Sequence, residues 1–221
     1  MDNEKKIAKA AMKRTHLTRD EVQEICQMAR DAEDYRAWAA FVLGFNHGFR
    51  VSELAGGSPT VAALQMQDID IKNRRINTRR LKGSVDDRHD LVDLRGNPTM
   101  SDVAALKAYF KVRIADGSDA VFTGQKGAMQ RQTLNLLFKD YAQKVSDARQ
   151  QRGLPSIPEE AQHFHVLRHS IGTLIANDPQ AGIFVAKNHL GHAAISSTQI
   201  YAHPDSRATA LAVKRVLANA A

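Results

Sequence analysis

The stretch HVLRHS, residues 165–170, places two histidines and an arginine at the start of a run with helical spacing. The apolar positions of that run recur at i, i+4, i+7 and i+8, namely Leu167, Ile171, Leu174 and Ile175. This spacing predicts a helix over residues 165–177 with one buried stripe. His165 and Arg168 lie one turn apart in its first turn, where free backbone N–H groups and the helix dipole favour an anion. An arginine fork there matches phosphate or carboxylate oxygens, although so short a motif is by itself more typical of a surface arginine beside a core histidine.

Composition narrows the choice of anion. The chain has 221 residues, of which 43% are hydrophobic and 25% charged, as in a folded globular protein with one large domain. Its net charge of +7 favours a polyanionic partner, with nucleic acid as the first candidate. No apolar run approaches the ~20 residues that span a bilayer, and the N-terminus lacks the apolar centre of a signal peptide. We therefore expect no membrane partner and a cytoplasmic, nucleoid-associated location, which the single cysteine, Cys26, also fits as a buried structural thiol.

The patterning predicts a mainly helical α+β fold with a small antiparallel three-stranded sheet. Thr18 and Glu21 have the spacing of a capping box, which starts a first helix that continues to about Arg30. A second helix is expected from Tyr35 to near Gly48. Short apolar segments broken by turn residues predict the strands between residues 66 and 94. Further helices are expected at 101–115, 130–150, 165–177, 180–190, 196–202 and 206–219.

Three other motifs place reactive side chains beside turns. In HGFRVSEL, Arg50 follows a glycine-terminated helix, and Glu53 lies one turn further on. In RRLKGSVDDR, Lys82 precedes a glycine in a predicted hairpin. In NHLGHAAISSTQIYAHP, His192 follows a helix-ending glycine, and Tyr201 lies on a short helix across a tight turn.

Taken in this order, the motifs resemble those of the tyrosine recombinases, also called the phage integrase family. The matching stretches are GFRVSEL, LKG, HVLRH, LGH and QIYAHP, and they cover about residues 15–205. The spacings from Arg168 to His192 and from His192 to Tyr201 fit the family. We expect the chain to be too short for the usual N-terminal clamp domain, so its layout is similar to that of the short fimbrial-switch invertases. An extra stretch around AGGSPTV separates Arg50 from Lys82.

The resemblance implies an enzyme that cleaves and rejoins DNA through a 3′-phosphotyrosyl intermediate, by inversion, integration or excision. It implies that Tyr201 attacks the scissile phosphate and that Lys82 protonates the departing 5′-oxygen. His165 is implied as general base or proton shuttle, a role that suits its ordinary pKa near neutrality. Covalent catalysis of this kind keeps the bond energy, so religation needs no ATP.

The same resemblance assigns the phosphate contacts. Arg50 and Arg168 are implied to hold the two non-bridging oxygens of the phosphate, and His192 to hydrogen-bond one of them. Glu53 is expected to orient Arg50 or a histidine without touching the substrate. His169 is expected to be exposed or locally hydrogen-bonded rather than catalytic.

Basic residues outside these motifs predict sequence-independent DNA contacts. The expected phosphate contacts are Lys5, Lys6, Lys13, Arg79 and Arg80. We expect a basic arm over residues 1–14, a catalytic domain over 15–204 and a helical segment over 205–221, which either packs on its own domain or docks on a neighbouring protomer. The expected partners are double-stranded DNA, further copies of the chain in a tetramer, and accessory DNA-bending proteins. No cofactor is expected.

Three alternatives use the same residues. Six of the nine histidines lie between residues 163 and 203, which is compatible with a metal site, but nearby acids are few and we expect no metal. A type IB topoisomerase shares the tyrosine chemistry without sequence preference. A DNA-binding regulator with the same fold would lack the activity, although every implied catalytic position holds a competent residue type.

Overall fold

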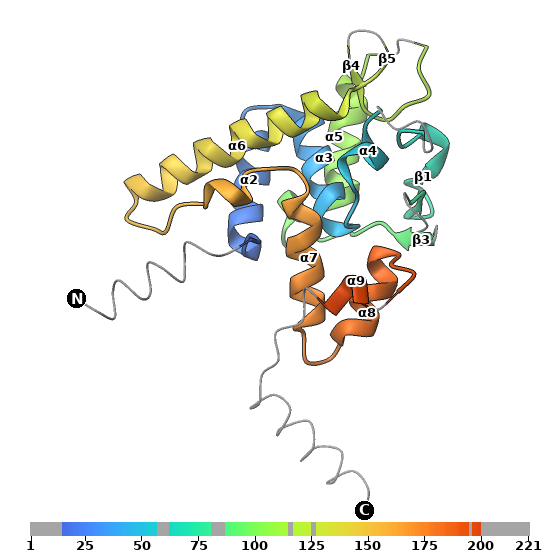
Figure 1. Ribbon diagram of the computed structural model, residues 1–221. Helices are drawn as coiled ribbons and strands as arrows, with labels where there is room; N and C mark the ends of the chain where they lie inside the picture. The colour runs from blue at the N-terminus through green and yellow to red at the C-terminus, as the bar shows by residue number, and fades with distance from the viewer. Residues whose placement is uncertain are drawn as a thin grey trace, which may run out of the picture.

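The computed structural model describes residues 15–56, 62–80, 87–114, 117–124, 127–194 and 196–199 (Figure 1). The helices are α2 (Arg19–Asp31), α3 (Tyr35–Asn46), α4 (Val51–Leu54), α5 (Asp102–Val112), α6 (Arg131–Gln151), α7 (Val166–Ala176), α8 (Gly182–Leu190) and α9 (Ser196–Gln199). The strands are β1 (Ile69–Asp70), β2 (Arg75–Thr78), β3 (Asp87–Asp90), β4 (Thr123–Gly124) and β5 (Gly127–Ala128). Several predicted catalytic or DNA-contacting positions lie outside the described ranges. They are Lys5, Lys6, Lys13, Lys82, Tyr201 and the segment 205–221.

Helix α3 forms the centre of the core. It is apolar on every face and buried from Ala37 to Phe45, as expected of a helix enclosed by others. Helices α2, α5, α6 and α7 all pack against it (Figure 1). A side chain at Gly44 would come within 2.6 Å of the Phe164 ring, so this glycine lets α3 approach the start of α7 closely. The rings of Phe41 and Phe138 meet edge to face at 5.2 Å beneath α6.

The three-stranded antiparallel sheet lies beside this bundle and has the order β1-β2-β3, which confirms the predicted sheet. Ile76 and Thr78 of β2 are buried, and Ile76 pairs with Ile69 on one side and His89 on the other. The last described pair of the hairpin is Thr78 with Asp87, so Lys82 lies in the sequence that joins β2 to β3. A second hairpin, β4–β5, was not predicted, because two residues a strand leave no alternating pattern.

Most helix predictions are confirmed. The capping box is present, since Thr18 Oγ1 accepts from the N–H of Glu21, and the carboxylate of Glu21 accepts from the N–H of Thr18.

Cys26 is fully buried, and burial raises the pKa of its thiol. No helix among the described residues is long and apolar enough to cross a membrane.

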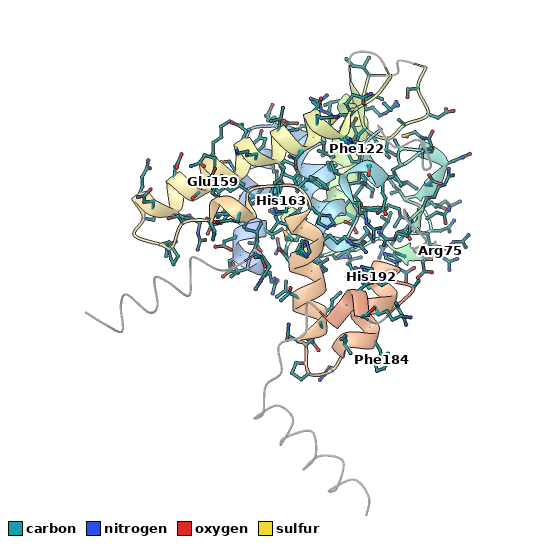
Figure 2. The ribbon with its side chains drawn as sticks, viewed as in Figure 1. Arg75, Phe122, Glu159, His163, Phe184 and His192 are labelled. Carbon is teal, nitrogen blue, oxygen red and sulfur yellow. The ribbon has the colours of Figure 1, made fainter. Side chains whose placement is uncertain are left out.

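The predicted buried stripe of α7 is wrong in one position. Leu167 is fully buried, but Leu174 is 39% exposed, while Arg168 and Ser170 are 1% and 0% exposed. The reason is that the start of α7 lies between α3, where Gly44 faces Leu167, and the end of α8, where Arg168 binds the Leu190 carbonyl. The second half runs out of the core toward α8, whose Phe184 is 69% exposed and points outward (Figure 2).

Candidate active site

The corner between α3 and α4 positions Arg50. Gly48 has a positive φ of 61°, and a side chain there would come within 2.5 Å of Leu190 Cδ2, so the turn requires glycine. Arg50 then precedes α4, and the carboxylate of Glu53, one turn later, accepts from both its N–H and its Nη1 at 2.8 Å. The Glu53 side chain is completely buried and that of Arg50 is 20% exposed. One carboxylate therefore fixes both the backbone and the guanidinium of Arg50.

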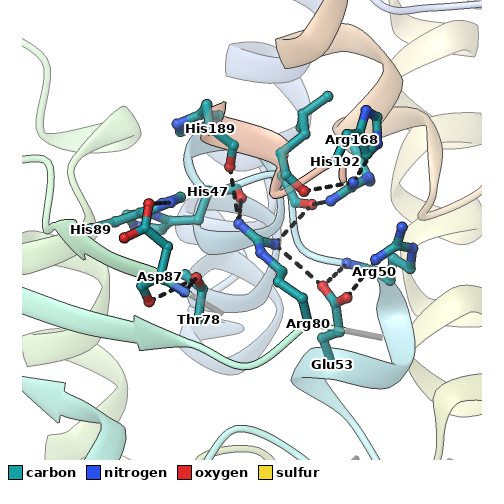
Figure 3. A network of polar contacts seen from close by, with 12 residues as sticks. His47, Arg50, Glu53, Thr78, Arg80, Asp87, His89, Arg168, His189 and His192 are labelled. Atoms are coloured by element: carbon teal, nitrogen blue, oxygen red, sulfur yellow. Dashed lines mark hydrogen bonds and ion pairs between the residues drawn. The ribbon is translucent and has the colours of Figure 1, made fainter. Parts of the chain in front are cut away.

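Arg168 joins three segments of the site. Its Nη1 donates to the carbonyl of Gly48 at 2.6 Å, and its Nη2 donates to the carbonyl of Leu190 at 2.8 Å. Nη2 also lies 2.7 Å from Nε2 of His192. Since an arginine has no acceptor, His192 accepts through Nε2, and its Nδ1–H donates to Thr198 Oγ1 at 2.9 Å. The guanidinium of Arg168 is thus held by the α3–α4 corner and by the end of α8 (Figure 3).

His165 immediately precedes α7 and forms, with His169, what we call the histidine pair. The two rings meet edge to face at 4.7 Å. Burial, followed by the charges of His169 and Arg168, lowers the pKa of His165 to about 4. The imidazole is therefore neutral at pH 7 and able to accept a proton.

The electrostatics bring Arg50, Arg168, His165 and His192 into one site. Burial lowers the pKa of His192 to about 4, and the charges of Arg168 and Arg50 act in the same direction. The same two arginines also lower the pKa of His165. Two guanidinium groups thus lie close enough to both imidazoles to perturb their titration, which concentrates positive charge at this site.

His169 lies closer to the site than the sequence suggested. We expected exposure or local hydrogen bonding; the structure half-buries His169 and sets its ring against that of His165. The spacing of four residues between them was the available signal, since i and i+4 side chains meet on a helix.

One predicted DNA contact is wrong. The Arg80 side chain is 0% exposed and bonded within the protein, so it does not present its charge to a DNA backbone. Arg79 and Arg80 follow β2 in extended chain, where successive side chains point to opposite faces. Only one of the two can therefore point outward. Arg79 is the outward one, with a side chain 40% exposed and an ion pair to Asp68 at 2.8 Å.

The two remaining predicted catalytic residues, Lys82 and Tyr201, lie next to described elements in the sequence. Lys82 belongs to the segment that joins β2 to β3. Tyr201 follows α9, which is linked to the site by the bond between His192 and Thr198, a fully buried residue. Across the described ranges, no three His, Cys, Asp or Glu side chains are grouped so as to hold a metal ion.

Comparisons with known proteins show the family of the chain. The model of the phage integrase family matches residues 15–207. Type 1 fimbriae regulatory protein FimE of Escherichia coli K12 is 29% identical over 198 residues, covering 86% of this chain and 85% of FimE. Tyrosine recombinase XerC of Roseiflexus sp. RS-1 is 30% identical over 203 residues, covering 88% of this chain and 56% of XerC.

Solved structures show the same fold. XerA recombinase superposes with a TM-score of 0.64 at 24% identity, covering 90% of this chain and 64% of XerA. XerH bound to its difH substrate also gives a TM-score of 0.64, at 21% identity, and this chain spans 54% of it. The family match and these relatives define a site-specific recombinase of the tyrosine class. The chain belongs to the phage integrase family.

Proposed function

We propose that this recombinase cleaves and rejoins double-stranded DNA through a covalent bond between Tyr201 and a 3′-phosphate. The observation that carries the proposal is the anchored Arg168, whose guanidinium is fixed by two backbone carbonyls beside Arg50 and two neutral imidazoles. When the two sites lie on one DNA molecule, their relative orientation decides between inversion and excision, and exchange between two molecules inserts one into the other.

Arg50 and Arg168 would bind the non-bridging oxygens of the scissile phosphate. Each guanidinium is held in place before substrate arrives, Arg50 by Glu53 and Arg168 by the carbonyls of Gly48 and Leu190. Donors fixed in advance stabilise the charge of the five-coordinate transition state without reorganising. Loss of either arginine is expected to cost about a hundredfold or more in rate.

The proton transfers divide between two groups. His165 takes the proton from the Tyr201 hydroxyl as the oxygen–phosphorus bond forms, and Lys82 gives a proton to the 5′-oxygen as its bond to phosphorus breaks. In rejoining, the same groups act in reverse: the 5′-hydroxyl attacks phosphorus and Tyr201 leaves. The low pKa of His165 keeps it neutral and ready to accept.

The other three tyrosines of the chain are committed to structure. Tyr109 is 3% exposed and donates to the carbonyl of Val121. Tyr141 is 6% exposed, and burial raises the pKa of its hydroxyl. Tyr35 begins α3, where its ring lies beside Trp38. These positions leave Tyr201 as the candidate nucleophile.

His192 would change partners when DNA binds. In the structure its Nε2 accepts from Arg168, whereas a hydrogen bond to a phosphate oxygen needs a proton on the imidazole nitrogen. A phosphate anion raises the pKa of a neighbouring histidine and draws the Arg168 donor to itself. Both effects favour a His192 that donates to the substrate.

DNA binding beyond the site would use the exposed basic residues. Arg79 and the arm residues Lys5, Lys6 and Lys13 would contact phosphates without reading sequence. Related structures include XerH with difH DNA and a lambda integrase dimer on a core site, which supports duplex DNA and self-association as proposals here. We likewise propose that four protomers assemble on two sites, with accessory DNA-bending proteins and with residues 205–221 docking on a neighbour.

The arm makes a separate prediction. Replacing Lys5 and Lys6 by alanine should reduce the slope of log affinity against log salt by about 2, because each lost phosphate contact removes ~0.9 from the slope. Binding to labelled duplex would be titrated from low to moderate salt. An unchanged slope would remove the arm from the interface.

A nicked substrate tests the central proposal. A duplex site, first selected by binding from a random pool, would carry a nick just 3′ of the cleavage position so that the released fragment diffuses away. We expect covalent protein–DNA complex with the wild-type chain and none with Tyr201→Phe, with or without EDTA. Binding without complex formation would favour the non-catalytic regulator, and relaxation of any supercoiled plasmid would favour the topoisomerase. Dependence on a metal would overturn the mechanism.

A further inference from the structure

Arg80 is a buried cation that the proposed chemistry does not use. It follows β2, two residues before Lys82 in the sequence, and its side chain is 0% exposed. Burial lowers the pKa of its guanidinium, which the carboxylate of Glu53 opposes. Burying a charge is costly unless it is paired and hydrogen-bonded, so the contacts of Arg80 should show what it is for.

Those contacts reach both sides of the site. Nη2 donates to the carbonyls of His47 at 2.8 Å and His189 at 3.1 Å. Nη1 lies 3.3 Å from Glu53 Oε2 and 3.4 Å from the carbonyl of Gly48. Figure 3 shows the guanidinium between the Glu53 carboxylate and these carbonyl groups. Its carbon also lies 5.1 Å from the centre of the Phe49 ring.

These four acceptors of Arg80 belong to segments that carry residues of the site. The carbonyls of His47 and Gly48 lie just before Arg50, and Glu53 binds Arg50 directly. The carbonyl of His189 lies three residues before His192. The Gly48 carbonyl is shared, since Arg168 donates to it at 2.6 Å. Arg80 and Arg168 therefore hold one peptide group from two directions.

A histidine stack, made of His47, His89 and His189, closes the same region. Nδ1 of His47 lies 3.1 Å from Nδ1 of His89, and the rings of His89 and His189 stack at 4.8 Å. His89 belongs to β3, and its ring contacts the rings of His47 and His189. Arg80, which follows β2, binds the backbone carbonyls of the same two residues. The hairpin is thereby tied to the α3–α4 corner and to α8.

We propose that Arg80 is a positioning residue that holds the two phosphate-binding arginines in place. It acts on Arg50 through Glu53 and on Arg168 through the Gly48 carbonyl. This inference rests on the proposed function of those arginines. A planar fork is required, because its two terminal nitrogens reach acceptors on opposite sides, whereas a lysine offers a single point of charge. Arg80 also contributes to the low pKa of His192.

The test compares two buried arginines. Arg149 of α6 is 9% exposed and binds the Glu24 carboxylate at 2.8 Å and the Pro155 carbonyl at 2.9 Å, away from the site. Arg80→Met and Arg149→Met therefore remove similar buried forks. At equal occupancy of a nicked DNA site, we expect Arg80→Met to cleave about 10- to 100-fold more slowly, as for a misplaced catalytic group, and Arg149→Met to keep the wild-type rate per folded molecule.

A substrate change separates positioning from simple support of the fold. A methylphosphonate at the scissile position replaces one charged non-bridging oxygen by a methyl group, so less charge needs to be stabilised. The Arg80→Met loss should shrink on this substrate if Arg80 acts through the oxygen-binding arginines. An equal loss on both substrates, or no loss on the phosphate, would overturn the inference. If Arg80→Met fails to fold, Arg80→Lys serves instead and should show the same substrate-dependent loss.

A second readout needs no DNA. In the free protein, the pKa of His192 followed by NMR should rise in Arg80→Met and stay unchanged in Arg149→Met. No rise would overturn the inference even if the wild-type chain formed no covalent complex. If the wild-type chain formed no covalent complex with DNA but the pKa of His192 rose in Arg80→Met as expected, the proposed function would be refuted. The coupling of Arg80 to His192 would still stand.

Discussion

The histidine pair and the histidine stack both lie near Arg168 but are held differently. In the stack, Nε2 of His47 donates at 3.0 Å to Asp102, a carboxylate with no exposed surface. Around the pair, the charged neighbours that lower the pKa of His165 include Arg168 and Arg50. A histidine fixed to a buried carboxylate keeps one tautomer and one orientation, whereas a proton-transfer group must be able to exchange its proton.

This difference shows that a lowered pKa alone does not identify a catalytic histidine. Burial is the main cause in both groups, and it lowers the pKa of His189 and of His165 alike to about 4. What distinguishes the groups is the identity of their partners. The pair faces the cationic site, and the stack is bonded into the scaffold that holds it.

The largest effect is expected on the pair. His165→Ala should slow single-turnover cleavage of the nicked site by about 10²- to 10⁴-fold, because it removes the proposed general base. The melting temperature should change little, since the side chain is only half-buried. Cleavage within tenfold of wild type would assign the base to another group and remove the distinction between pair and stack.

The stack should respond in stability instead. The Asp102 carboxylate accepts from His47, from Asn46 Nδ2 at 2.9 Å and from the N–H of Val92 at 2.6 Å. Asp102→Ala leaves the buried His47 and the half-buried donors of Asn46 and Val92 without this partner, and should cost about 3 kcal/mol of unfolding free energy. Urea unfolding measures this loss, with the exposed Asp147→Ala on α6 as a control expected to stay within about 0.5 kcal/mol.

The residues of the proposed active site and those of the scaffold around it also differ in how far the sequence predicts them. Helix spacing and capping residues gave the helices, and the order of short motifs gave Arg50, His165, Arg168 and His192. The roles of Arg80, Asp102 and the stack were not visible, because they depend on side chains brought together by tertiary packing from β3, α5 and α8. Adjacent arginines at 79 and 80 read alike in a sequence, and only the direction of the chain after β2 separates the exposed one from the buried one.

Acid should weaken the fold through the stack as well as through His165 and His192, whose pKa values are also lowered to about 4. The pKa values of His89 and His189 are lowered to about 2 and about 4, below the ordinary 6.5 expected in the unfolded chain. Between pH 6.5 and 4 the unfolded state binds protons that the folded state excludes, so stability is complete above pH 6.5 and falls as the pH decreases. Each such histidine contributes a slope of up to about 1.4 kcal/mol per pH unit.

Urea unfolding at pH 7, 6 and 5 would measure that slope in wild type and in His89→Gln. We expect a shallower slope in the variant because one excluded proton is removed. Equal slopes would mean that the stack does not carry the acid sensitivity.

The smallest effect is expected from the second member of the pair. His169→Leu removes one of the positive neighbours that lower the pKa of His165, so that pKa should rise toward 6.5. Because His165 stays mostly neutral at pH 8, cleavage there should change by less than about tenfold. NMR titration of His165 gives the shift, and a fall in its pKa would contradict the assigned geometry.

The most direct measurement of the central claim is the identity of the residue joined to DNA. Covalent complex trapped on the nicked site would be digested with trypsin and nuclease, and the modified peptide would be sequenced by mass spectrometry. The peptide between Lys187 and Arg207 contains a single tyrosine, Tyr201, and the account predicts a phosphodiester-linked nucleotide on it. A linkage on Tyr35, Tyr109 or Tyr141, or on a residue other than tyrosine, would contradict it.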